Sequence, residues 1–159
     1  MEIRPARAGD FDAMWGMFKA AIAAQDALPF AGSFGVETFR AHWFQAQAPH
    51  VAMLEGRVVG MYKMGPNFPD LGAHVASATY VVDAPAQGQG VGRALVEHSL
   101  ERARAEGFLA MQFNYVVSTN GPAVALYRKL GFDVVGTLPK AFRHGTLGLV
   151  DVFVMHRFL

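Results

Sequence analysis

The sequence predicts a single α/β domain over residues 1–159, built on a mixed β-sheet of about six to seven strands with helices on both faces. Strand-like and helix-like hydrophobic patterns alternate along the chain in the order β-α-α-β-β-β-α-β-α-β-β. Residues 80–117 form a strand–helix–strand unit, whose crossover is expected to be right-handed. With 52% hydrophobic residues, a chain of 159 residues can bury one complete core. This order describes one sheet covered on both sides by helices.

The first half of the chain is expected to hold three strands and two helices. Pro5 limits the first strand to a sheet edge or a strand end, because proline has no N–H to donate. Asp10 is predicted to cap a helix, since apolar side chains follow it at the spacing of an amphipathic helix. Gly56 lies in the short loop of a predicted hairpin. The expected elements are strands at residues 3–6, 50–54 and 58–64, and helices at residues 11–25 and 36–47.

The second half is expected to alternate strands with helices. A strand of β-forming residues runs into a glycine-rich turn, and an apolar stripe with helical spacing then continues until Gly107. Asn120 is the predicted cap of the next helix, Pro122 lies in its first turn and Gly131 ends it. The expected strands are residues 74–82, 109–117, 132–137 and 150–157.

The glycine-rich turn is the most informative stretch of the chain. Gly88, Gly90 and Gly92 lack Cβ atoms, so the backbone can curl until successive N–H groups point into one concavity. The N-terminus of the following helix adds partial positive charge there, which favours phosphate oxygens. The dinucleotide fingerprint G-x-G-x-x-G/A fails in both registers, because Arg93 or Leu95 stands where glycine or alanine is needed. No Gly-Lys pair supports a nucleotide P-loop.

Two motifs on predicted elements carry a family resemblance. The turn fits the pattern Q/R-x-x-G-x-G/A through Gln87, Gly90 and Gly92. The segment from Asn120 to Phe132 fits the pattern N-x-x-A-x-x-L-Y-x-x-x-G-F at every specified position. Together they resemble the two signatures of the GNAT superfamily of N-acetyltransferases, the first of which is its acetyl-coenzyme A pyrophosphate loop. The resemblance covers most of the chain from residue 50 onward and is weak in the first two helices.

The resemblance implies a GNAT-like fold in which the two central parallel strands splay apart and the acyl-pantetheine arm of acetyl-CoA lies between them. Tyr80 and Val82 are then expected to contact pantetheine through main-chain atoms, in the manner of an added strand. Asn120 is expected to reach pantetheine or its ordered water, and Tyr127 to lie beside the sulfur. The residues expected to hold the pyrophosphate are Gln87, Gly88, Gly90, Gly92 and Arg93.

The reaction that the resemblance implies is attack of a neutral amine on the thioester carbonyl. An alkyl amine with a pKa of about 10.4 is mostly protonated at pH 7, so it must first lose a proton. Tyr127, a neutral phenol, is expected to act as the general acid that protonates the departing thiolate. The general base stays open: the candidates are relay through water and the side chains of Asp26, Glu37, His74 and Tyr115.

The acceptor is expected to be the primary or secondary amine of a small molecule, such as an amino acid or its analogue. The stretches around Asn114, at residues 138–144 and at residues 147–151 resemble a narrower GNAT branch that includes fungal enzymes acetylating proline-like amino acids. That likeness implies that Asn114 hydrogen-bonds the acceptor, and His74 is a second candidate for acceptor binding. Two other interpretations stay open. One is a protein or peptide N-acetyltransferase; the other is a non-catalytic acyl-CoA-binding module, which would be indifferent to Tyr127.

Composition narrows the partners and the location. A net charge of +1 without Lys/Arg runs argues against a nucleic-acid surface, and no apolar run approaches the roughly 20 residues that span a membrane. The chain has no cysteine, and its six histidines show no metal-ligand spacing, so no metal is expected. We therefore expect a cytoplasmic protein. With 8 Met, 13 Phe and only 17% charged residues, surplus apolar surface is predicted, which favours a homodimer or a roofed substrate cleft.

Overall fold

The computed structural model describes residues 1–45 and 48–159. Within these residues it contains seven strands and four α-helices in the predicted order. The elements are β1 (Glu2–Pro5), α1 (Phe11–Ala23), α2 (Val36–Phe44), β2 (His50–Leu54), β3 (Arg57–Pro66), β4 (Val75–Val82), α3 (Val91–Ala105), β5 (Ala110–Val117), α4 (Gly121–Lys129), β6 (Asp133–His144) and β7 (Gly148–Phe158).

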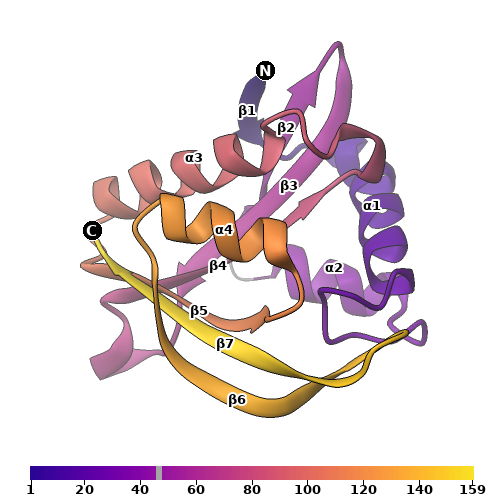
Figure 1. Ribbon diagram of the computed structural model, residues 1–159. Coiled ribbons are helices and arrows are strands. Elements are labelled where there is room, and N and C mark those ends of the chain that lie inside the picture. The colour runs from indigo at the N-terminus through magenta and orange to yellow at the C-terminus, as the bar shows by residue number, and fades with distance from the viewer. Residues whose placement is uncertain (46–47) are drawn as a thin grey trace.

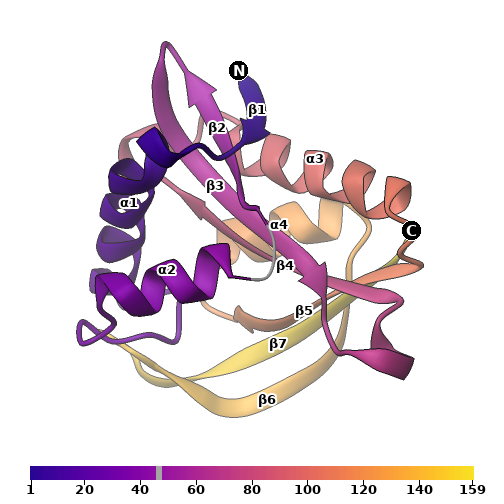
Figure 2. The same ribbon diagram turned by 180° about the vertical axis from the view of Figure 1, so that it is seen from behind.

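The strands form one mixed sheet in the order β1-β2-β3-β4-β5-β7-β6. Every neighbouring pair is antiparallel except β4 and β5, which run parallel. Helices α3 and α4 cover one face of the sheet and α1 and α2 the other, as Figure 1 and Figure 2 show from opposite sides. The predicted mixed sheet with helices on both faces is therefore confirmed.

In the first half of the chain, one helix prediction needs correction and another can be followed only as far as the described residues extend. Asp10 stands at the start of α1 as predicted, but its carboxylate makes no hydrogen bond to the first turn of that helix. It accepts instead from the Arg7 N–H at 2.7 Å and pairs with the Arg4 guanidinium at 2.7 Å, because Asp10 ends a short 3₁₀ turn, Ala8–Asp10, and its carboxylate bonds back to the residue before that turn. The helix predicted at residues 36–47 is present as α2 up to Phe44, and residues 46 and 47 lie outside the described residues.

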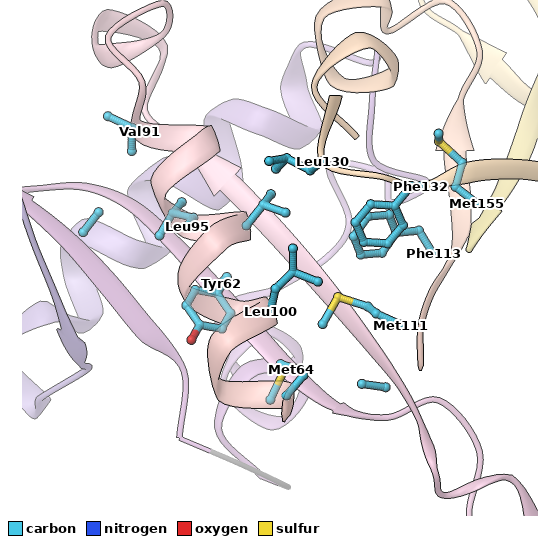
Figure 3. Close-up of a cluster of buried hydrophobic side chains, with 14 of the residues drawn as sticks. Tyr62, Met64, Val91, Leu95, Leu100, Met111, Phe113, Leu130, Phe132 and Met155 are labelled. Carbon is cyan, nitrogen blue, oxygen red and sulfur yellow. The ribbon is translucent and has the colours of Figure 1, made fainter. Parts of the chain in front are cut away.

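The core lies in two layers, one on each side of the sheet. Under α3 and α4, apolar side chains of the helices pack against β4, β5 and β7, and Figure 3 shows the centre of this layer. Phe113 of β5 and Phe132 stack there with ring centroids 4.5 Å apart. On the other side, aromatic residues of α1 and α2 close over Met61 and Val81. This second layer contains the buried rings of Phe18, Phe39 and Trp43.

Strands β4 and β5 are joined only where they begin. Their register pairs are Val75 with Ala110 and Ala76 with Met111, and no further pair follows within the described residues. Strand β5 then turns away at an irregularity between Phe113 and Val116 in its pairing with β7. Such irregularities bend a strand locally. The predicted splaying of the two central parallel strands is therefore present.

Strand β6 is longer than predicted and interrupted. The sequence predicts it at residues 132–137, yet pairing with β7 extends to Leu138, resumes at Phe142 and continues to His144. The interruption is real, since Lys140 has a φ of 52° and its N–H donates to Asp151 Oδ1 at 3.0 Å. The prediction was wrong about the strand's end, because a local break does not stop the pairing of the two chain segments on either side of it.

The tip of the β6–β7 hairpin contacts the loop after α1. The Gly145 N–H donates to the Gln25 carbonyl at 2.9 Å, and a Cβ on Gly145 would meet the Gln25 Oε1 at 2.9 Å. Figure 1 and Figure 2 both show the hairpin reaching across to this loop. This contact joins two segments about 120 residues apart in the chain and borders the side of the sheet that carries α1 and α2.

A polar network joins α3 to β2 and β3 inside the first layer. The Arg102 guanidinium lies 3.2 Å from His50 Nδ1 and 3.4 Å from the Tyr62 hydroxyl, and it pairs with Glu106. The Tyr62 hydroxyl in turn lies 2.8 Å from His98 Nδ1. Because an arginine only donates, the Tyr62 hydroxyl accepts from Arg102. Burial first, and then the Arg102 charge, lowers the pKa of His50 to about 4.

Candidate active site

The separation of β4 from β5 leaves one edge of β4 without a strand partner. The Val75 carbonyl accepts from the Asn67 N–H at 2.8 Å, and the Asp83 N–H donates to Val59 at 2.9 Å, so the odd-numbered residues of β4 face β3. Main-chain groups alternate in direction along a strand in an antiparallel pair. The N–H and C=O groups of Tyr80 and Val82 therefore point into the gap beyond the last β4–β5 pair. This is the orientation that main-chain contacts to an inserted ligand require.

The glycine-rich turn lies at the far end of this edge, at the N-terminus of α3, as predicted. Gly88 and Gly90 have φ angles of 78° and 81°, a backbone conformation that L side chains rarely adopt, and no atom lies within 4 Å of where their Cβ atoms would be. Regular helical bonding begins with Ala94 N–H to the Gly90 carbonyl. Five main-chain N–H groups before Ala94 donate to no acceptor among the described residues. They belong to Gly88, Gly90, Val91, Gly92 and Arg93.

These unpaired donors lie together at a helix N-terminus. Unpaired N–H groups and the positive end of the helix dipole both favour an anion there. Gly92 differs from the expectation in one respect. It lies in the first turn of α3, and its Cβ position has ordinary contacts, 3.7 Å from Val82 Cγ2 and 3.8 Å from Leu126 Cδ2. The curl of the backbone therefore depends on the first two glycines and not on the third.

Two polar side chains flank the turn. The Gln87 side chain is exposed and makes no hydrogen bond with a described residue. Arg93 is also exposed, and its Nε lies 2.9 Å from the Glu97 carboxylate one helical turn later. An exposed i,i+4 pair contributes only about 0.3–0.5 kcal/mol, so a bound phosphate could draw the guanidinium away from Glu97 at little cost.

Tyr127 of α4 points into the aromatic cluster beside the gap. Its ring lies 4.6 Å from Phe113, 5.9 Å from Phe132 and 6.3 Å from Tyr80, measured between centroids. Burial of the phenol raises the pKa of Tyr127 to about 12. Its hydroxyl makes no hydrogen bond with a described residue, and it is not among the buried polar atoms sealed from solvent. The group is therefore a neutral proton donor whose hydroxyl remains available.

Asn120 performs its predicted structural role. Its side-chain oxygen accepts from the Ala123 N–H at 3.4 Å at the start of α4, and Pro122 lies in the first turn. Capping uses the amide oxygen and leaves the amide NH₂ without a partner among the described residues. Its contact with pantetheine stays a prediction.

Asn114 lies at the irregularity of β5, on the face opposite Tyr127. Its amide and that of Asn67 exchange two hydrogen bonds, Asn67 Nδ2 to Asn114 Oδ1 at 3.2 Å and Asn114 Nδ2 to Asn67 Oδ1 at 2.5 Å. Gln112 donates to the same Asn114 oxygen at 2.9 Å. Asn114 is thus exposed and held by side chains instead of by backbone, and binding of an acceptor by it stays a prediction.

The structure does not bring His74 to this group. Its carbonyl accepts from the Leu109 N–H at 2.9 Å, at the end where β4 and β5 are still joined. At about 3.3 Å per residue, His74 and Tyr80 are about 20 Å apart along the strand. Of the other base candidates, Glu37 pairs with Arg40, the Tyr115 hydroxyl donates to the Ala141 carbonyl and Asp26 is exposed in the loop after α1. None of the four side chains is placed as an evident base.

Sequence reasoning missed a bond that holds the two halves of the site together. The Tyr80 hydroxyl donates to Ser99 Oγ at 2.7 Å, and Ser99 donates to the Val96 carbonyl at 2.7 Å. The strand edge and the helix that carries the glycine-rich turn are thereby tied to each other. A signal existed, because Ser99 is a polar residue in line with the apolar stripe of α3.

The described residues contain neither a membrane-spanning helix nor a cluster of metal ligands. No helix is both long and apolar enough to cross a membrane. No group of three His, Asp or Glu side chains is gathered as metal ligands would be.

Comparison with known proteins identifies the family. The model of the Acetyltransferase (GNAT) family matches residues 20–132. A mycothiol acetyltransferase of Saccharomonospora viridis is 42% identical over 107 residues, which are 64% of this chain and 35% of that protein. An L-methionine sulfoximine/L-methionine sulfone acetyltransferase of Pseudomonas paraeruginosa is 32% identical over 109 residues, 64% of this chain and 62% of that protein. The chain thus spans about a third of the length of the first relative and under two thirds of the second.

A solved structure matches along nearly the whole chain. The GCN5-related N-acetyltransferase from Kribbella flavida has a TM-score of 0.96 and 42% identity, and the match covers 99% of this chain and 97% of that one. The predicted fold and the predicted family resemblance are both confirmed. Because the family model covers more than half of the sequence, and the splayed strands and the glycine-rich turn lie where the motifs predict them, this chain belongs to the Acetyltransferase (GNAT) family.

Proposed function

We propose that this chain is an acetyl-CoA-dependent N-acetyltransferase that acetylates the amine of a small molecule. The observation that carries the proposal is the continuity of the β4 edge with the N–H groups of the glycine-rich turn, beside the Tyr127 phenol. The donor set fits acetyl-CoA. Unpaired main-chain groups suit an amide-containing extended arm, and clustered N–H groups at a helix N-terminus suit a pyrophosphate.

Each expected contact has a role in holding that molecule. Main-chain groups of Tyr80 and Val82 hold the pantetheine arm, and Asn120 offers its free amide. The N–H groups of the turn hold the pyrophosphate, with Gln87 and Arg93 at its rim. Bound acetyl-CoA supplies an activated acetyl thioester.

Tyr127 is proposed to solve the proton problem at the sulfur. As the new N–C bond forms and the C–S bond breaks, the phenol gives its proton to the departing sulfur, and the amine loses one proton to a base or to water. With a pKa of about 12, the phenol is still protonated at any pH at which the protein would be assayed. The hydroxyl needs no prior partner to be displaced, since no described residue binds it.

The nature of the acceptor, the location of the protein and its oligomeric state stay predictions. The names of the relatives, a mycothiol acetyltransferase and a methionine sulfoximine/methionine sulfone acetyltransferase, support a small-molecule acceptor. The narrower resemblance and the cytoplasmic location also stay predictions. A homodimer is supported by exposed apolar side chains near the joined ends of β4 and β5. These are Phe68, Leu71, Leu109 and Phe158, each more than 60% exposed.

Replacement of the phenol tests the proposal directly. Tyr127→Phe keeps the ring packing on Phe113 and removes only the proton donor, so we expect kcat to fall by about 10²–10⁴-fold. The Kd for acetyl-CoA should stay within about twofold of wild type. The measurements are thiol release with an acceptor panel, and calorimetric titration with acetyl-CoA.

The matched control is Tyr62→Phe. It removes a hydroxyl that contacts only Arg102 and His98 and should lower the unfolding free energy by about 1 kcal/mol while leaving kcat in place. Wild-type turnover in Tyr127→Phe would end the general-acid role. Failure of acetyl-CoA to bind wild type would end the proposed function itself.

A further inference from the structure

The sheet face toward α1 and α2 carries a hydrogen-bonding surface beside the gap. Side chains alternate along strands, and Ala76, Ala78 and Tyr80 of β4 point into the core layer under α3. Ser77 and Thr79 therefore point to the opposite face, where both are partly buried. On β5 the same alternation places Gln112 and Asn114 on that face, since Met111 and Phe113 lie in the core layer. The gap is thus bordered on this side by hydroxyl and amide groups from both strands.

Lys63 brings the one positive charge to this surface. Its register partner across the β3–β4 pair is Thr79, so it lies one strand away from the Tyr80 edge and on the same face as Thr79. Strands β4 and β5 contain no charged residue, and the other charged residue of β3, Arg57, is exposed at the opposite end. On the three strands around the gap, Lys63 is therefore the only cation near the site.

The Lys63 side chain is partly buried and has no counter-charge among the described residues. Its Nζ donates to the His42 carbonyl at 2.7 Å and lies 5.7 Å from the centroid of the Trp43 ring. No carboxylate of a described residue lies within ion-pair distance of it, and the two residues outside the description, 46 and 47, are alanine and glutamine. Burial lowers the pKa of Lys63 to about 8. The titratable group that faces it is His42, whose own pKa is lowered by burial and then by the Lys63 charge.

The ammonium has unused binding capacity. An ammonium carries three donors, and the bond to His42 uses one of them. A cation taken out of water is unfavourable until an anion and hydrogen bonds compensate it. The neighbouring hydroxyl and amide groups offer further hydrogen bonds to a bound anion. A cationic amine placed there would be repelled by the Lys63 ammonium.

We propose that Lys63 recognises a carboxylate on the acetyl acceptor, so that the acceptor is an amino carboxylic acid and not a polyamine or an uncharged amine. This inference rests on the proposed function, because it assigns the acceptor side of the same gap. The acceptor's carboxylate takes the free Lys63 donors, and its amine faces the gap where acetyl transfer occurs. The surface that selects the acceptor then lies on the opposite face of the sheet from Tyr127.

Matched acceptors separate this role from general binding. The twenty standard amino acids are compared with their carboxamides, which keep the amine and side chain and lose the anionic charge. Wild type should prefer the best acid over its carboxamide by at least about tenfold in kcat/KM, through KM, because the carboxamide cannot form the charge-assisted hydrogen bond with the ammonium. Equal use of acids and carboxamides by wild type would overturn the inference.

Variants assign the preference to the ammonium. Lys63→Gln keeps an N–H donor for the His42 carbonyl and removes the charge, so it should lose about tenfold on the acid and little on the carboxamide. Lys63→Arg should keep most of the preference. Lys19→Gln is the matched control, since Lys19 also lies over a tryptophan, 5.3 Å from the Trp15 ring centroid, but on the exposed side of α1. A Lys63→Gln protein that still prefers acids, or that loses both acceptors equally, contradicts the inference.

Binding measurements separate this inference from the proposed function. Calorimetric titration of the same acids and carboxamides into CoA-loaded protein needs no turnover. Acid-selective binding that disappears in Lys63→Gln without thiol release in wild type would retain the inference and reject the enzyme. Rapid acetylation of carboxamides and polyamines would retain the enzyme and reject the inference. The absence of acid-selective binding would also reject the inference. If Lys63→Gln fails to fold, wild type and Lys63→Arg still decide between these outcomes.

Discussion

Gly90 and Gly92 lie two residues apart in one turn, yet the structure uses them differently. Gly90 has a φ of 81°, where a Cβ costs about 1–2 kcal/mol for backbone reasons alone. Gly92 is helical and has room for a methyl group in ordinary contact with Val82 and Leu126. We expect Gly90→Ala to lower the unfolding free energy by about 1 kcal/mol and to weaken acetyl-CoA binding. Gly92→Ala should be neutral or stabilising by up to about 1 kcal/mol, because alanine favours helices.

Urea denaturation and acetyl-CoA titration of the two alanine variants check this pair. Equal losses of stability in both variants would show that Gly92, like Gly90, is needed for the conformation of the turn. That outcome would favour the sequence-based prediction that all three glycines shape the turn.

Residues with local roles could be predicted from the sequence. Asn120 caps its helix through a contact three residues away, and Gly88 and Gly90 adopt the curl that their position before a helix suggests. Lys63 and the Asn67–Asn114 amide pair could not be found this way. The Asn67–Asn114 bonds join residues 47 positions apart, and Lys63 matters only because β3, β4 and α2 meet around it. No periodicity within one segment contains such information.

Among the elements, α3 depends on Gly60 of β3 for its position. A Cβ on Gly60 would lie 2.8 Å from Val91 Cγ1 and 3.0 Å from Leu95 Cδ1, so the helix approaches the strand over a bare backbone. Gly60→Ala should cost about 1–3 kcal/mol of stability through overpacking. Because Val91 opens the helix at the glycine-rich turn, the same change should weaken acetyl-CoA binding.

Gly136→Ala is the control for a strand glycine with space. The nearest atom to its Cβ position is Val154 Cβ at 4.0 Å, and we expect a change below about 1 kcal/mol. Thermal unfolding and acetyl-CoA titration of both variants make the comparison. If Gly60→Ala is as mild as Gly136→Ala, the close approach of α3 to β3 has no energetic weight.

The elements themselves were largely predictable, and their ends were less so. Hydrophobic spacing and turn residues gave all eleven in the correct order within the described residues. Strand β6 exceeded its prediction because pairing with β7 continues past Lys140, and pairing depends on the partner strand. The splaying of β4 and β5 followed from the family resemblance alone, since neither strand contains a residue that marks where its pairing stops.

At the scale of the whole molecule, the network around Arg102 makes stability depend on pH. His50 is buried with a pKa of about 4, and it faces Arg102, His98 and Tyr62. Unfolding returns His50 to an ordinary pKa of about 6.5, so the unfolded chain binds the proton first as pH falls. We expect the unfolding free energy to fall between about pH 6.5 and 4, by up to about 3 kcal/mol from this residue, and to lose nothing further from it below pH 4.

Denaturation at a series of pH values measures this slope. His50→Asn keeps an acceptor for Arg102 without a titrating ring, and its profile should be flatter over that range. The control His74→Gln removes an exposed histidine and should keep the wild-type slope. An unchanged slope in His50→Asn would place the acid sensitivity elsewhere, for example at His98, whose pKa is also lowered by burial.

The parting of β4 from β5 gives the sheet an unpaired edge in its interior. At the rim of a sheet such an edge is an aggregation hazard, because strands of other proteins can pair with it. Here the two strands remain joined at Val75 and Ala76, so only the few residues from Ala78 to Val82 offer free main-chain groups. This free edge is too short for strands of other proteins to pair with it and build a fibril. It is long enough to hydrogen-bond one extended ligand.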